Sequence, residues 1–116
     1  MTTLSIIAAN IDLSAQEGDT RMLEIEVPAI INMAGKNIHF AVFKGRQVLF
    51  EKINDGTRSD WTVTGQDIET KIEEEDTWER SGKWRYELEV WSGNNVYTIM
   101  KGDFTIEPQL IRIKRH

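Results

Sequence analysis

The chain has 116 residues, the size of one domain, and 40% of them are hydrophobic, including four Trp and four Phe, which is enough to fill one core. It has no cysteine, which excludes a disulfide framework and a thiolate metal site. Its net charge of −5 argues against non-specific nucleic-acid binding, because that activity needs clustered lysine and arginine on one face.

The first ten residues are mildly apolar, but they lack a basic region, and Asn10 and Asp12 interrupt the apolar stretch. We therefore expect no signal peptide at this end. No apolar run in the chain approaches about 18 residues, so we expect no membrane-spanning segment.

Alternating apolar residues predict strands in the first half of the chain. Residues 22–27 alternate until Pro28 ends the run. Residues 38–43 alternate in the same way, and the next apolar run covers 48–53. Gly45 and the arginine after it lie between these two runs, so we expect a hairpin with its turn at Gly45.

The middle of the chain contains one short predicted strand and one departure from period two. Trp61 and Val63 mark the strand. Between Gln66 and Glu79 there are seven acids and one lysine, with Ile68 and Ile72 four residues apart. This spacing predicts a short helix near residues 66–76 that crosses between sheets, with acids at the positive end of its dipole.

The acidic run at residues 73–76 is a weak candidate for a cation site. A calcium loop needs oxygen ligands at fixed offsets around a turn glycine, and no glycine lies inside this run. We interpret it as a solvated helix face.

The clearest strand covers residues 83–92, and a turn at 92–95 pairs it with a strand that begins at Val96. Pro108 ends that last strand, because proline removes a ladder donor. Trp91 lies on the charged face of residues 83–92, opposite the core face. Aromatic side chains in such places are enriched at interfaces, so Trp91 is a candidate partner-binding residue, with packing at the core edge as the alternative.

These patterns predict an all-β fold: an antiparallel two-sheet β-sandwich, Ig-like or jelly-roll-like, with one short helix near residues 66–76. Residues 1–108 form the domain, and residues 109–116 form an extended carboxyl-terminal arm. The predicted core consists of side chains from three alternating runs: Leu23, Ile25, Val27, Ile38, Phe40, Val42, Trp84, Tyr86, Leu88 and Val90.

The arm alternates apolar and basic residues, whereas residues 1–111 carry 11 basic and 19 acidic side chains, a balance of −8. An arm of this kind suits strand addition to a neighbour's sheet edge, with the acidic body of that neighbour beside it. An arm folded back on its own domain or left loose is the alternative. Its candidate partner-binding residues are Leu110, Ile111, Arg112, Ile113, Lys114 and Arg115.

No arrangement typical of catalysis occurs in the sequence. His39 lies inside a predicted strand without a neighbouring nucleophile motif, so we interpret it as structural or exposed. With two histidines and no cysteine, we expect no zinc site, no other cofactor and no enzymatic activity.

Two stretches carry a resemblance to a known family. The first is Gln-Glu-Gly-Asp-Thr at residues 16–20, before the first strand. The second is Ser-Gly-Lys-Trp-Arg-Tyr-Glu-Leu-Glu-Val at residues 81–90, with its continuation at 96–106. Together they resemble small β-sandwich virion proteins of tailed bacteriophages, in particular the amino-terminal domain of baseplate upper proteins, or a stand-alone capsid decoration protein. Trp84 replaces the family's usual first tyrosine, and Ile106 replaces a valine.

The resemblance implies a non-enzymatic virion structural protein, made in the cytoplasm of the bacterial host. Its partners would be other virion proteins, onto which it docks as a tail or baseplate adaptor or as a capsid decoration (cement) protein. It would form a homo-oligomer in the particle and bind neither nucleic acid nor membrane. The alternative is a carbohydrate-binding β-sandwich module, with Trp61, Trp78 or Trp91 as a stacking platform.

Overall fold

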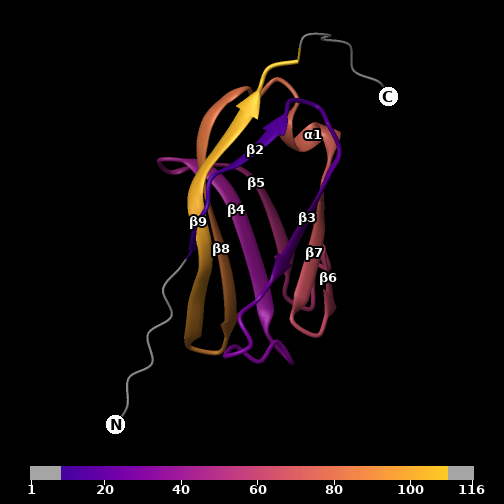
Figure 1. Cartoon of the computed structure of the whole chain (residues 1–116), viewed down its shortest axis with the longest axis vertical. Helices are drawn as coiled ribbons and strands as arrows, with labels where there is room; N and C mark the ends of the chain where they lie inside the picture. Colours follow the sequence, from indigo (N-terminus) through magenta and orange to yellow (C-terminus); the bar gives the residue numbers. More distant parts are fainter. Residues whose placement is uncertain (1–8, 110–116) are drawn as a thin grey trace.

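The computed structural model describes residues 9–109, which form two packed sheets and one turn of helix (Figure 1). The elements in chain order are β1 (Ala9–Asn10), β2 (Leu13–Gln16), β3 (Arg21–Glu26), β4 (Asn37–Lys44), β5 (Gln47–Asn54), β6 (Trp61–Thr64), β7 (Asp67–Ile72), α1 (Glu74–Thr77), β8 (Gly82–Ser92) and β9 (Asn95–Glu107).

The strand order identifies the type of sandwich. The large sheet has the order β1-β9-β8-β4-β5, and β2 also pairs with β9. The small sheet has the order β3-β7-β6. The first strands, β1 and β2, run parallel to β9, while the other pairs are antiparallel. This is the order of an immunoglobulin-like sandwich. Strand β5 is added beyond β4, at the edge of the sheet that also contains the last two strands. Of the two predicted architectures, the structure is the Ig-like one.

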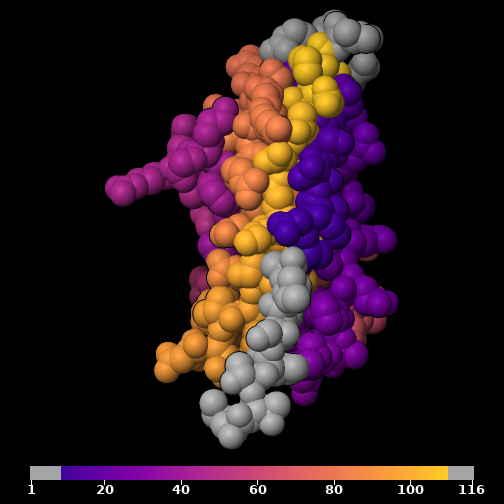
Figure 2. All heavy atoms as spheres, turned by 60° about the vertical axis from the view of Figure 1, so that its left-hand side comes forward, coloured from indigo at the N-terminus to yellow at the C-terminus, as the bar shows by residue number. Residues whose placement is uncertain are grey.

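Both predicted hairpin turns are confirmed. Gly45 (φ +60°) and Arg46 connect β4 to β5, and Gly93 (φ +58°) and Asn94 connect β8 to β9. Two-residue hairpins of this kind need positive φ, which glycine adopts without strain. Figure 2 shows the β4–β5 turn projecting from the body and the indigo first strands lying along the yellow β9.

The core lies between the sheets and is centred on Phe40. The ring of Phe40 has its centroid 5.7 Å from that of Tyr86, 6.1 Å from that of Phe50, and 6.4 Å from those of Trp61 and Phe104. The rings of Trp61 and Phe104 meet that of Phe40 edge-on, at 76° and 63°, an arrangement that aromatic pairs prefer. The predicted core is confirmed: Val27, Ile38, Phe40, Val42, Tyr86, Leu88 and Val90 are buried, and Leu23, Ile25 and Trp84 pack against them half-buried.

The segment predicted as a helix, residues 66–76, is mainly the strand β7, so the predicted extent of the helix is wrong. Ile68 and Ile72 are four residues apart, a spacing that suits both a helix face and a strand face. Thr70 decides between the two, because it is buried and its hydroxyl donates a hydrogen bond of 2.6 Å to the carbonyl of Asp60. A buried threonine thus completes the inward face of a strand.

The acidic run around α1 is not the solvated helix face that the sequence predicts. Glu74 is buried. The carboxylate of Asp76 accepts the N–H of Glu73 at 2.7 Å and lies 2.7 Å from the Nζ atom of Lys52. Because Lys52 belongs to β5, this half-buried ion pair holds α1 against the large sheet.

Candidate functional site

Three segments that are distant in sequence meet at one pole of the sandwich, residues 17–19, 77–79 and 107–109, at the top of Figure 1. We call this the exit corner, because the described part of the chain ends there. The Glu17 side chain is fully buried, and its carboxylate accepts the N–H of Glu79 at 2.5 Å. A backbone N–H bound to a carboxylate compensates part of the cost of burying the charge.

Gln109 is held in the exit corner by its backbone and by its side chain. Its N–H donates to the Glu17 carboxylate at 3.3 Å. Its side-chain amide donates to the carbonyl of Glu17 and, at 3.1 Å, to the carboxylate of Asp19. The chain therefore leaves the sandwich at a fixed place.

Gly18 makes the close packing of this corner possible. Its φ is +81°, and its N–H donates a hydrogen bond of 2.8 Å to the hydroxyl of Thr77. A Cβ atom at this position would lie 2.8 Å from the Trp78 ring, closer than carbon atoms approach. Both the turn and the packing thus require glycine.

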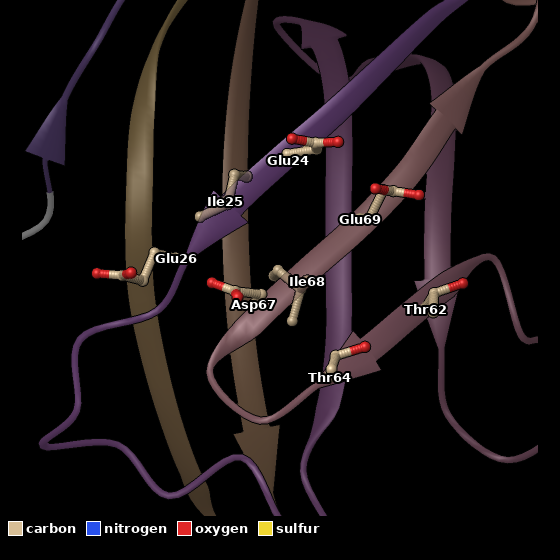
Figure 3. A pocket seen from close by; sticks show the side chains of 8 residues that line it. All are labelled: Glu24, Ile25, Glu26, Thr62, Thr64, Asp67, Ile68 and Glu69. Atoms are coloured by element: carbon tan, nitrogen blue, oxygen red, sulfur yellow. The ribbon is translucent and has the colours of Figure 1, made fainter.

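A row of carboxylates faces solvent from the small sheet, and Figure 3 shows them on neighbouring strands. Glu24 lies opposite Glu69, and Glu26 lies opposite Asp67. We call these four residues the acidic face. Together with threonines of β6, they line an open pocket of about 570 Å³.

The acidic face brings like charges together. A side-chain hydrogen bond with Glu24, with smaller contributions from burial and from the Glu24 charge, raises the pKa of Glu69 above its ordinary value. Like charges directly opposite one another destabilise an antiparallel pair. None of the four carboxylates forms an ion pair with any residue in the range 9–109.

Strand β3 is an edge strand, since among the described strands it pairs with β7 alone. The N–H of Val27 donates to the carbonyl of Gln66 at 2.8 Å. In an antiparallel ladder such bonds occur at every second residue, so the backbone groups of Ile25 point to β7 and those of Glu24 and Glu26 point to the open edge. A pocket of about 310 Å³ lies between this edge and the strands β1 and β9, and its apolar lining consists of Ala9, Ile11, Ile25, Pro28, Ile99 and Met100.

The edge of β5, by contrast, is partly occupied by the chain that follows it. The N–H of Asp60 donates to the carbonyl of Ile53 at 3.0 Å, and the Asp60 carboxylate accepts the Ile53 N–H at 2.8 Å. The Trp61 indole donates to the carbonyl of Lys52 at 3.0 Å. Occupied edge groups protect a strand from pairing with another chain. Strand β3 has no such cover among the described residues.

The predicted partner-binding residue Trp91 is half-buried on the outer face of the large sheet, beside Val96 on β9 and Asn37 on β4. Val96 is 56% exposed, so the two side chains form an apolar end of this face. The other predicted partner-binding residues lie outside the described residues: Leu110, Ile111, Arg112, Ile113, Lys114 and Arg115.

Trp61 cannot serve as a stacking platform for a carbohydrate, since it is 5% exposed and its ring packs on Phe40. His39 lies on the outer face of the large sheet, where its Nε2 atom contacts the Glu51 carboxylate. In residues 9–109 no group of three or more metal-binding side chains is placed to hold an ion.

The sequence interpretation missed the acidic face and the open edge beside it. It identified the alternation of residues 22–27, but it assigned the partner segment to a helix. With residues 67–72 treated as a strand, the acids at Asp67 and Glu69 would fall on the outward face, like those of β3. The available signal was the alternation of Ile68, Thr70 and Ile72 with charged residues, which a hydropathy pattern overlooks because it counts Thr70 as polar.

Comparison with known proteins bears on the fold. No model of a known protein family matches the chain, and no curated protein sequence does either. The extracellular domain of the voltage-gated sodium channel β4 subunit, described in parallel homodimer structures, superposes with a TM-score of 0.50 and 13% identity over 99% of both chains. A candidate glycoside hydrolase from Bacteroides vulgatus gives a TM-score of 0.46 and 18% identity over 84% of this chain, which spans 16% of the hydrolase. In the described part of this chain, no helix has the length and apolarity needed to cross a membrane. At 13% identity the likeness to the β4-subunit domain concerns the fold alone, an all-β sandwich of the Ig-like kind.

Proposed function

We propose that this chain is a non-enzymatic structural protein of a tailed-bacteriophage virion. It is a β-sandwich module that docks onto neighbouring capsid or tail subunits through the arm that follows Gln109. Binding, and not chemistry, is then the task of its surface.

The observation that carries this proposal is the exit corner. Gln109 is tied by hydrogen bonds to Glu17 and Asp19, so the arm starts from a fixed point on the domain. A segment whose starting point is fixed loses less freedom when it binds, and this favours docking. The stretches that resemble virion modules, residues 16–20 and 81–106, supply the turn of this corner and the hairpin β8–β9 that leads to it.

Purified particles test the proposal. Phage particles from the bacterium that encodes the chain are purified by density gradient, and their proteins are quantified by mass spectrometry. We expect the chain in a fixed ratio to the capsid and tail proteins, also after a high-salt wash. A chain that remains in the soluble lysate, as an abundant host protein does, would refute the proposal.

The exit corner is tested by substitution in the same particles. Gln109→Ala removes the side-chain hydrogen bonds to Glu17 and Asp19, and we expect it to lower incorporation without unfolding the domain. Gln47→Ala, at an exposed position at the start of β5, is the matched control and should leave incorporation unchanged.

A further inference from the structure

We propose that the open edge of β3 receives Arg112, Ile113 and Lys114 of a second copy as an added strand. This inference rests on the proposed function and deepens it, because it names the receiving surface and the partner. The arm residues enter through their sequence, since they lie outside the described residues.

The backbone of the receiving edge is available for strand addition. Glu24 and Glu26 direct their N–H and C=O groups away from β7, toward the open edge of the small sheet. Main-chain hydrogen bonds to such groups provide affinity when a strand is added, and alternate side chains provide specificity. β6, the other edge of the small sheet, has four residues, whereas β3 has six.

The side chains of the edge and of the arm are complementary in alternation. Glu24 and Glu26 face outward, and between them Ile25 lines the apolar pocket of about 310 Å³. In the arm a basic residue, an apolar residue and a basic residue follow one another, Arg112, Ile113 and Lys114. With Ile113 beside Ile25, both basic side chains lie beside the two glutamates, whether the added strand runs parallel or antiparallel. The apolar side chain then points into the pocket.

Charge favours this pairing over an uncharged occupant. The acidic face holds four carboxylates that form no ion pair with residues 9–109, and Glu69 lies opposite Glu24. Two cations beside Glu24 and Glu26 would relieve this repulsion, most strongly at low salt.

Chain length directs the arm to a second copy. Gln109 is bound to Asp19, two residues before β3 begins. From Asp19 to Ile25 the chain advances six residues, about 20 Å when extended, whereas from Gln109 to Ile113 it advances four, about 13 Å. Within one chain, Ile113 would therefore fall short of Ile25, and by this count Arg115 would be the residue level with it. A second copy has no such restriction on register.

Cysteine pairs test the contact, because the chain has no cysteine of its own. One preparation of the full chain carries Ile25→Cys, the other carries Ile113→Cys, and the two are mixed under mild oxidation. Position 25 is a non-hydrogen-bonded site for an antiparallel added strand, where opposite Cα atoms lie about 4.5 Å apart, within disulfide range. We expect this mixed dimer to form at least about tenfold faster than the one obtained when Val48→Cys, an exposed control on β5, takes the place of Ile25→Cys. Equal rates would overturn the proposal, as would an intramolecular disulfide in a chain that carries both cysteines.

Charge reversal gives a second test that does not depend on a disulfide. Glu24→Lys with Glu26→Lys reverses the edge, and Arg112→Glu with Lys114→Glu reverses the arm. In sedimentation experiments each double variant alone should self-associate at least about tenfold more weakly than the wild type, and a mixture of the two should recover association. Glu87→Lys with Glu89→Lys, the same charge change at the same spacing on β8, is the control. Unchanged association of both double variants would overturn the proposal. A mixture that associates as weakly as either double variant alone would also overturn it.

These results are separate from the particle experiment. If the chain occurs in particles but the tests detect no contact between edge and arm, this inference is wrong and the proposed function stands. If the tests detect the contact but the chain is absent from particles, the proposed function is wrong and the contact between copies stands.

Discussion

The indole N–H of Trp84 donates a hydrogen bond of 2.9 Å to the carbonyl of Arg80, four residues earlier. In immunoglobulin domains a tyrosine at the start of this strand makes a bond to upstream backbone, and a cysteine follows two residues later. Here Trp84 takes the place of the tyrosine, and the fully buried Tyr86 takes that of the cysteine. In this chain an indole is the donor of the corner bond, and Tyr86 packs against the rings of Phe40 and Phe104.

Trp84→Phe removes this bond while keeping an aromatic ring. We expect the free energy of unfolding to fall by about 1 kcal/mol, because the Arg80 carbonyl loses its donor. The measurement is chemical denaturation. Trp91→Phe on the same strand is the control, since no hydrogen bond of its indole occurs among the described residues. An equal loss in both variants would contradict the role of the bond.

Phe40→Ala empties the centre of the aromatic core. Phe40 is fully buried and contacts four other rings, so we expect a loss of roughly 3–5 kcal/mol in the free energy of unfolding. Phe43→Ala, on the same strand but half-buried on the outer face, should cost clearly less. Similar losses for the two variants would show that the core is centred elsewhere.

Tyr86 links the core to the first strands and predicts a dependence on alkaline pH. Its hydroxyl donates to the carbonyl of Ile11, and burial, with the charge of Asp12 as a smaller cause, raises its pKa to about 12. The unfolded chain loses this proton near pH 10 and the folded chain near pH 12. Between these values the folded state holds more protons, so its stability falls as the pH rises.

The measurement for Tyr86 compares thermal unfolding from pH 9 to pH 12. The wild type should lose more stability over this range than Tyr86→Phe, which has no phenol to ionise at that position. At pH 8 the same substitution should cost about 1 kcal/mol through the lost bond to Ile11. Identical pH profiles would show that Tyr86 ionises freely.

The sequence predicted the parts of the fold that depend on local alternation. The hairpins around Gly45 and Gly93 and the inward faces of β4 and β8 follow from period two and from turn chemistry, and all are confirmed. Strand β7 escaped prediction because its inward face includes Thr70, whose burial depends on a hydrogen bond to Asp60, a residue outside the strand.

The candidate site depends on pairings between distant segments, which alternation does not specify. The contacts of Gln109 with Glu17 and Asp19 join residues 90 or more apart in the chain. The opposition of Glu24 and Glu69 depends on the register of β3 on β7. Each of these residues is an ordinary surface or turn residue in the sequence, and partners from elsewhere in the chain give it its role.

The paired carboxylates of the acidic face predict a gain in stability when one charge is removed. Glu69 lies opposite Glu24, and its raised pKa means that the folded chain binds this proton more readily than the unfolded chain does. The stability from that proton is therefore present in acid and is lost as the pH rises through the folded pKa. At neutral pH, Glu69→Gln removes the repulsion, and we expect Tm to rise by about 1–3 °C. The gain should shrink as the pH falls into the range where Glu69 itself is protonated.

The control is Glu87→Gln, because Glu87 lies opposite Lys101 on the other sheet; this substitution should not raise Tm. A fall in Tm for Glu69→Gln at neutral pH would show that Glu69 is stabilised in its charged form, contrary to the direction of its pKa.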